Sequence, residues 1–326
     1  MSITTLILTF CVIYVNGLTD APNSVATCIV TRCLPLRLAI FLSAIMNFLG
    51  VCVASKISPA VTETIINMVN FGNDVHKSEI GLAAALFSIV LWAVISWYFG
   101  IPTSESHALI AGLTGSALAL NGGFQGINPT EWIKAIYGLF ISCGMGFVGG
   151  FIICRIVMAV FRNMQRQKAE GFFRNAQIFS CLLMSFMHGA QDGQKFIGVL
   201  LLCTKGKGLS PVFAVILCSL IMAAGTATGG KKIIKSVGMD MVKAQRYQGF
   251  AADLSGAISL AVSTAFGLPV STTHAKTTAI MGTGLAKNRK NLNTDIIKDI
   301  ALAWLLTFPG CGALGYIMTR IFFSIF

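Results

Sequence analysis

The chain is a succession of long apolar runs separated by short polar segments. Apolar runs such as LAIFLSAIMNFLGVCVA (38–54) and SPVFAVILCSLIMAAG (210–225) approach the roughly 20 residues that a helix needs to cross a bilayer. Two further runs are interrupted by glycine and charged residues, in NGLTDAPN (16–23) and HGAQDGQK (188–195). This pattern predicts an all-α polytopic membrane protein in which polar motifs interrupt spanning helices.

The interruptions recur in the same order in two halves of the chain. The interruption NGLTDAPN is followed by GIPTSESHALIAGLTGSAL (100–118), and the interruption HGAQDGQK is followed by GLPVSTTHAKTTAIMGTGL (267–285). Two motifs that recur in one order indicate an internal duplication. The matching pairs are Gly17 with Gly189, Asp20 with Asp192, Gly100 with Gly267, Pro102 with Pro269, Ser104 with Ser271, and His107 with His274.

The duplication predicts the domain organisation. We expect a first repeat at 1–160, a basic cytoplasmic linker at 161–176 and a second repeat at 177–326. Each repeat is expected to contain a broken transmembrane helix (about 3–31 and 177–204) and a re-entrant helical hairpin at the G-x-P-x-S motif. Whether the hairpin arms re-enter or span, each half crosses an odd number of times. The two repeats should therefore have inverted topology, as in many secondary transporters.

Composition and charge agree with a membrane protein. Hydrophobic residues make up 55% of the chain and charged residues 11%, against about 25% charged in soluble domains. The net charge of +12 does not indicate nucleic acid, because the basic residues lie in short loops without interleaved aromatics. With the N-terminus outside, most of the 24 lysines and arginines fall in predicted cytoplasmic loops, as the positive-inside rule requires. We expect a multi-pass plasma-membrane protein.

Enzymatic and metal-site motifs are missing from the sequence. The ten cysteines lie mostly within apolar runs and form no C-x-x-C pair, which favours neither disulfides nor a zinc site. The chain also lacks H-E-x-x-H, G-x-S-x-G and a P-loop. We therefore expect a protein that is not an enzyme and that uses no cofactor.

The repeated motifs carry candidate binding groups. Pro102 and Pro269 suit helix starts, and the hydroxyls that follow can cap the helix or bind an oxyanion. Such hydroxyls also serve structural roles in membrane helices, by bonding to their own backbone or to neighbouring helices. Asp20 and Asp192 differ, because a carboxylate at membrane depth is costly and usually marks an ion or proton path. Glu63 lies in a segment expected at the membrane interface, and Glu105 has Thr272 as its repeat partner, so the repeat does not support a functional role for Glu105.

The motifs NGLTDAPNSVAT and HGAQDGQKFIG, each followed by G-[IL]-P-x-S-x-x-H, resemble the inorganic phosphate transporter (PiT) family in its short bacterial form. The resemblance implies uptake of inorganic phosphate driven by a H⁺ or Na⁺ gradient. It does not decide whether the protein forms a homo-oligomer. It places Thr103, Ser104, Ser271 and Thr272 at the hairpin tips, and Asp20, Asn23, Asp192 and Lys195 on the broken-helix motifs.

The predicted site combines the motif residues with this resemblance. The expected phosphate ligands are Thr103, Ser104, Ser106, Ser271, Thr272, Thr273 and Lys195. The expected coupling-ion residues are Asp20, Asn23 and Asp192, with Na⁺ at Asp20 and Asn23 as the one metal left open. His107, His274 and His188 are assigned either a proton-carrying or a structural role.

Two positions depart from the family pattern. Thr19 and Gln191 stand where the family has Asn before the aspartate, and Lys195 stands where sodium-coupled members tend to have Asn. A lysine ammonium can act as a tethered cation in place of one sodium. We therefore expect coupling to protons, or to one sodium at the Asp20 half only.

The sequence alone leaves alternative functions open. Sulfate is also a tetrahedral oxyanion, so a sulfate permease of the same fold is the main alternative. A carboxylate beside the anion favours phosphate, because it accepts a hydrogen bond from HPO₄²⁻ but only repels sulfate. A passive channel is a further alternative, and accumulation against a gradient would exclude it.

Overall fold

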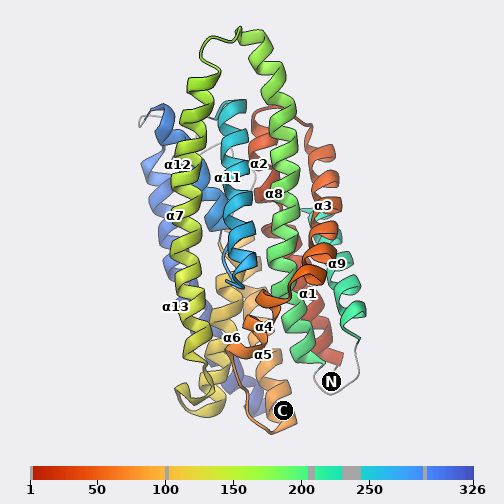
Figure 1. The fold of residues 1–326 in the computed structure, drawn as a ribbon. Helices are drawn as coiled ribbons and strands as arrows, with labels where there is room; N and C mark the ends of the chain where they lie inside the picture. The colour runs from red at the N-terminus through yellow and green to blue at the C-terminus, as the bar shows by residue number, and fades with distance from the viewer. Residues whose placement is uncertain (1–2, 100–102, 205–209, 230–243, 289–291) are drawn as a thin grey trace.

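The computed structural model describes residues 3–99, 103–204, 210–229, 244–288 and 292–326, and helices account for most of them (Figure 1). The first half of the chain begins with two short helices in series and ends with a long one. Its elements are α1 (Ile3–Thr19), α2 (Pro22–Val30), α3 (Leu36–Ile57), α4 (Ala60–Met68), α5 (Val75–Phe99), α6 (Glu105–Asn121), the 3₁₀ helix η1 (Phe124–Gly126) and α7 (Pro129–Val160).

The second half has a similar order of elements but begins with one long helix. The described elements are α8 (Arg166–Cys203), α9 (Pro211–Thr228), α11 (Arg246–Ala265), α12 (Thr272–Lys287) and α13 (Thr294–Ile325). Most of the segment expected as a linker, from Arg166 onward, belongs to the start of α8.

The expected break in the first half is present, and the expected break in the second half is wrong. The chain turns at Asp20 and Ala21 between α1 and α2. Pro22 begins α2 and has no N–H to continue the hydrogen bonding of α1. In α8 the matching position is Gln194, which keeps its N–H, and the helix runs through HGAQDGQK without interruption. Glycines in this motif lower helix propensity but do not prevent a helix.

Six stretches of the described residues are long and apolar enough to cross a membrane. Their outer faces carry exposed aromatic and aliphatic side chains, for example Phe140 on α7 and Leu305 on α13. This is the surface expected against lipid. The six stretches are Ile3–Val30, Leu36–Ile57, Val75–Phe99, Pro129–Val160, Pro211–Thr228 and Ile297–Ile325.

Two helix crossings depend on glycine at matching positions. Gly17 on α1 packs against α9, where a Cβ would lie 2.3 Å from the Met222 carbonyl oxygen. Gly189 on α8 packs against α3, where a Cβ would lie 2.2 Å from the Asn47 carbonyl oxygen. Only glycine permits backbones to approach so closely. Each half therefore packs its first helix against a helix of the other half.

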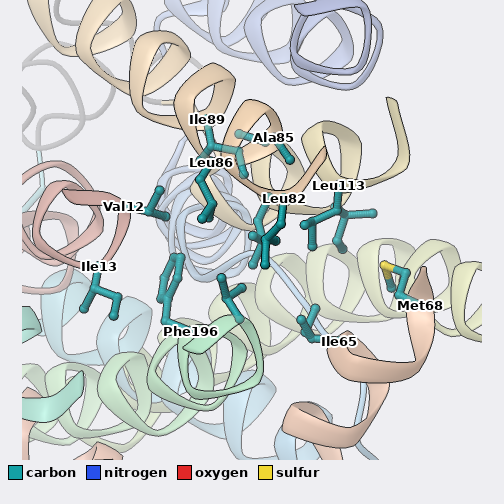
Figure 2. Close-up of a cluster of buried hydrophobic side chains, with 14 of the residues drawn as sticks. Val12, Ile13, Ile65, Met68, Leu82, Ala85, Leu86, Ile89, Leu113 and Phe196 are labelled. Atoms are coloured by element: carbon teal, nitrogen blue, oxygen red, sulfur yellow. The ribbon is translucent and has the colours of Figure 1, made fainter. Parts of the chain in front are cut away.

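The hairpins and the long final helices also pack across the halves. The α5–α6 and α11–α12 pairs occupy opposite ends of the molecule (Figure 1). Helix α7 packs along α12, and α13 packs along α6. Between α5 and α6 lies the largest apolar cluster, in which Leu86, Ile89 and Leu113 meet Phe196 of α8 (Figure 2). These contacts hold the starts of α6 and α12 at the centre of the fold.

Candidate functional site

The tips of the two hairpins have the same local structure. Ser104 precedes α6, and its hydroxyl oxygen accepts a hydrogen bond from the His107 backbone N–H at 3.2 Å. Ser271 precedes α12 and accepts in the same way from His274 N–H, also at 3.2 Å. These N-caps confirm that the hydroxyls following the prolines cap helices. Pro269 itself stands before the cap and not in the first helical turn, and Pro102 lies outside the described residues.

Asp20 lies at the α1–α2 turn and faces the start of α12. Its Oδ1 accepts hydrogen bonds from Asn23 Nδ2, at 3.1 Å, and from the Thr273 hydroxyl. Its Oδ2 lies 3.3 Å from the Thr272 hydroxyl. Asn23 also donates to Thr273 at 3.1 Å. Asp20, Asn23 and Thr273 therefore form a closed triangle of contacts between α2 and α12.

Asp192 lies on α8 and faces the starts of both hairpin helices. Lys195 Nζ lies 2.6 Å from Asp192 Oδ1 and 2.5 Å from the Ser106 hydroxyl on α6. Its third acceptor is the Val270 carbonyl oxygen, just before α12. An ammonium has three donors, so all three are engaged. Lys195 acts here as a fixed cation that joins α8 to both hairpin tips.

The Lys195 arrangement repeats the Asn23 arrangement. Asp192, Lys195 and Ser106 form the same triangle as Asp20, Asn23 and Thr273, and each member stands at the matching position of the repeated motifs. Thr272 joins the two triangles, since its hydroxyl lies 3.2 Å from Asp192 Oδ2 as well as near Asp20. The site is therefore one two-sided cluster.

Asp20, Asp192 and His188 could together hold a cation. One ligand atom from each lies within 4.8 Å of the other two. His188 Nδ1 lies 2.8 Å from Asn47 Oδ1, an oxygen that can only accept, so Nδ1 carries a proton. Its other ring nitrogen, Nε2, lies 3.3 Å from Asp192 Oδ2. Two carboxylates and an imidazole nitrogen can bind a proton or a metal cation.

Two asparagines contact these carboxylates through their amide nitrogens. Asn16 Nδ2 donates to Asp192 Oδ2 at 3.2 Å, and Asn23 Nδ2 donates to Asp20. Among the described residues the Oδ1 atoms of Asn16 and Asn23 are buried and have no hydrogen-bond partner. Carbonyl oxygens of this kind are ligands for hard cations. Sequence reasoning missed Asn16, although it lies one helical turn before Asp20, as His188 lies one turn before Asp192.

His107 and His274 meet at the centre of the fold. Their ring centroids are 4.5 Å apart in an edge-to-face arrangement. On α13, Phe308 stacks on His107 with centroids 4.5 Å apart, and Trp304 lies 3.7 Å from His274. These ring contacts tie both hairpin tips to the final helix. They favour the structural role among the two considered for these histidines.

Glu105 and Gln191 also belong to the cluster. Glu105, at the start of α6, is buried and accepts a hydrogen bond from the Thr19 hydroxyl at 3.1 Å. Gln191 donates to the Leu268 carbonyl oxygen at 2.7 Å and accepts from the Thr264 hydroxyl at 2.5 Å. Thr19 and Gln191, the two departures from the expected Asn, thus each hold a hairpin. Glu63 lies on the short helix α4, outside these contacts.

The structure buries every residue predicted for the site. Most of them make the mutual contacts described above, while Thr103 stands just before the α6 cap. The buried set is Asp20, Asn23, Thr103, Ser104, Ser106, His107, His188, Asp192, Lys195, Ser271, Thr272, Thr273 and His274.

The described helices are those of a multi-pass membrane protein with a buried polar cluster at its centre. The fold is similar to that of a solved structure described as "The sodium-dependent phosphate transporter", with a TM-score of 0.85, 22% identity and 99% of each chain covered. A model of the phosphate transporter family matches residues 16–315. The chain is 34% identical to a probable low-affinity inorganic phosphate transporter of Bacillus subtilis, over 99% of this chain and 98% of that protein. A protein of the same description from Rhizobium meliloti is also 34% identical, over 91% and 89%. The chain belongs to the phosphate transporter family.

Proposed function

We propose that this protein is a secondary active symporter that takes up inorganic phosphate by alternating access, driven by H⁺ or by one Na⁺. The observation that carries the proposal is the doubled triangle of contacts around Asp20 and Asp192. One triangle contains a fixed cation, Lys195, and the other contains the neutral Asn23. The relatives described above are named as inorganic phosphate transporters, and their likeness supports phosphate as the substrate.

The two halves are proposed to be inverted repeats, 1–160 and 177–326. Matching glycines make matching contacts, since Gly17 meets α9 as Gly189 meets α3. The hairpins α5–α6 and α11–α12 approach the centre from opposite ends (Figure 1), which is the arrangement of re-entrant hairpins in inverted repeats. By the positive-inside rule, the basic residues around the connection between α7 and α8 support an orientation with that end in the cytoplasm and the N-terminus outside the plasma membrane.

Phosphate is proposed to bind where the two hairpin tips meet. The N-terminal ends of α6 and α12 carry positive partial charge and free backbone N–H groups, which favour an oxyanion. Ser104 and Ser271 accept hydrogen bonds as caps, and each hydroxyl still has a proton to donate. The set of proposed phosphate ligands is completed by Thr103, Ser106, Thr272, Thr273 and Lys195.

The charges of the site explain why a cation should accompany the anion. The cluster buries Asp20, Asp192 and Glu105 with one lysine, so its fixed charges do not favour an anion. Adding phosphate next to two carboxylates is unfavourable unless further positive charge enters with it. At the Asp192 side, Lys195 already balances the carboxylate. At the Asp20 side a mobile H⁺ or Na⁺, held by Asp20, Asn23, Asn16 and His188, is proposed to supply the further positive charge.

Uptake of radiolabelled phosphate into proteoliposomes tests the proposal. Na⁺ is removed in one series, and the pH gradient is collapsed in another. We expect accumulation against the phosphate gradient that depends on one of the two gradients, with no requirement for two sodium ions. Arsenate should compete and sulfate should not, because a carboxylate beside the anion repels a fully ionised oxyanion. Passive equilibration, a stoichiometry of two sodium ions, or preferential sulfate uptake would each reject the proposal.

A further inference from the structure

A second buried ion pair lies beside the central site. Asp253 on α11 and Lys276 on α12 are fully buried and in direct contact. Thr27 on α2 donates to Asp253 Oδ1 at 2.7 Å and accepts from Lys276 Nζ at 3.2 Å. The Ser24 carbonyl oxygen lies 3.4 Å from the same Nζ. Two of the three acceptors of Lys276 therefore belong to α2, the short helix after the break at Asp20.

This ion pair has no counterpart in the first half of the chain. In the register of the repeated motifs, Asp253 and Lys276 match Leu86 and Leu109, while Ser24 and Thr27 match Phe196 and Val199. All four matching residues belong to the apolar cluster between α5, α6 and α8, and Figure 2 shows Leu86 and Phe196 within it. The register is supported by matching contacts, since Ser116 bonds the Gly81 carbonyl as Gln248 bonds the Thr283 carbonyl.

The comparison shows that the fold does not need an ion pair at this place. Leu86 and Leu109 close the equivalent space with apolar side chains alone. Burying two charges is costly, and apolar replacements of buried ion pairs are often as stable or more stable. Asp253 Oδ2 and the Thr277 hydroxyl are also buried without a hydrogen-bond partner among the described residues. Stability alone therefore does not explain Asp253 and Lys276.

The position of Lys276 points to the path of the anion. It follows Thr272 by four residues on α12, so both side chains lie on one face of the helix, about 6 Å apart along its axis. Thr272 bridges Asp20 and Asp192 in the central site. In Figure 1, α2, α11 and α12 occupy the same end of the molecule as the connection between α7 and α8. Lys276 is thus one turn from the central site toward that end.

We propose that Lys276 forms a second, transient site for the tetrahedral oxyanion, on the release path between the central site and the end that carries the α7–α8 connection. This inference rests on the proposed transport function. When α12 separates from α2, Lys276 loses Thr27 and the Ser24 carbonyl together. The anion replaces them and binds to the ammonium, which keeps Asp253 as its remaining partner. The apolar cluster closes the opposite side of the central site.

Two double variants test the second site. Asp253→Asn with Lys276→Gln removes both charges and keeps polar side chains, while Asp253→Lys with Lys276→Asp keeps an ion pair but moves the cation to α11. For both we expect phosphate affinity in detergent, measured by calorimetry, within about two-fold of the unmodified protein, and initial uptake rates at least about ten-fold lower. A double variant of the ion pair on α7, Glu131→Gln with Lys134→Gln, should transport at the unmodified rate.

The outcomes separate this inference from the proposed function. Unmodified uptake by the neutral pair, or restored uptake by the exchanged pair, would show that the ion pair is only structural and would overturn the second site. Loss of equilibrium phosphate binding would overturn it too, because it would make Lys276 part of the central site. If the neutral pair fails to fold, the exchanged pair decides alone. A failure of the unmodified protein to accumulate phosphate would instead reject the transport function itself.

Discussion

Lys195 and Asn23 occupy matching positions against two aspartates: Lys195 Nζ lies 2.6 Å from Asp192 Oδ1, and Asn23 Nδ2 lies 3.1 Å from Asp20 Oδ1. One side of the site thus pairs its aspartate with a lysine ammonium, and the other side pairs its aspartate with a neutral amide. The difference predicts that the two aspartates need different numbers of mobile cations.

Replacing Lys195 with asparagine should make the two sides alike. Lys195→Asn removes the fixed cation and leaves Asp192 with the same neutral partner that Asp20 has. We expect phosphate uptake to gain a dependence on Na⁺, with the Hill coefficient for Na⁺ rising by about one as a second ion becomes necessary. Uptake measured against Na⁺ concentration in proteoliposomes checks this. An unchanged cation dependence with intact transport would show that Lys195 does not stand in for an ion.

Removing the charge of Asp192 should abolish transport. Asp192→Asn leaves Lys195 buried without its carboxylate, and breaking a buried ion pair on one side costs about 3–5 kcal/mol. We expect uptake at least about a hundred-fold lower, because the site also loses a group that faces the coupling cation. Thermal unfolding in detergent is measured in parallel. Asp295→Asn, at an exposed aspartate on α13, serves as the control, and normal uptake by Asp192→Asn would contradict the assigned site.

The capping role of the two serines can be distinguished from their proposed role as phosphate ligands. Replacement of Ser104 or Ser271 by alanine should destabilise the hairpin tip by about 1 kcal/mol, whereas glycine costs only a few tenths at an N-cap. If the hydroxyls also bind phosphate, both replacements should raise KM for phosphate by a similar factor. Uptake kinetics and thermal unfolding of the four variants provide the comparison. If KM for phosphate instead changed in parallel with thermal stability, and differed between the alanine and glycine variants, the serines would act only as helix caps.

The crossing of α8 and α3 should not tolerate a side chain at Gly189. A Cβ there would lie 2.2 Å from the Asn47 carbonyl oxygen, and Asn47 also contacts His188. We expect Gly189→Ala to destabilise the protein by about 1–3 kcal/mol, as overpacking does, and to lower uptake by displacing His188. Gly144→Ala on α7 is the matched control, because a Cβ there would meet no atom of the described residues within 4 Å. Equal thermal stability of the two variants would contradict the tight crossing.

The sequence predicted which polar residues meet better than it predicted the course of the helices that carry them. Asp20, Asp192, Lys195 and the hydroxyls Ser106, Thr272 and Thr273 were expected together because each recurs or stands within a repeated motif, and the structure brings them into contact. A charged side chain at membrane depth needs partners, so the motifs that carry such residues had to meet.

The continuity of α8 could not be inferred from the repeat. The two motifs share the glycine and the aspartate, but Pro22 breaks the first helix and Gln194 allows the second to continue. Asp253 was also missed, since it lies outside both repeated motifs and its partner Lys276 becomes evident only when α11 and α12 are packed together. To predict Asn16 as a site residue, one must consider that helical residues four apart share a face, because Asn16 lies four residues before Asp20.

The contrast between the Asp253–Lys276 pair and its apolar counterpart around Leu86 and Leu109 has an energetic consequence for the proposed transport cycle. If the two halves were identical, the inward-open and outward-open forms would be equivalent by symmetry and would be equally populated in the absence of gradients. Because an ion pair lies on one side of the central site and an apolar cluster lies on the other, the two forms are not equivalent. The empty carrier should then rest in one orientation, and phosphate should saturate its two faces at different concentrations. The accumulation ratio at equilibrium stays fixed by the driving gradients, because a difference between resting populations changes rates and not the overall free energy of transport.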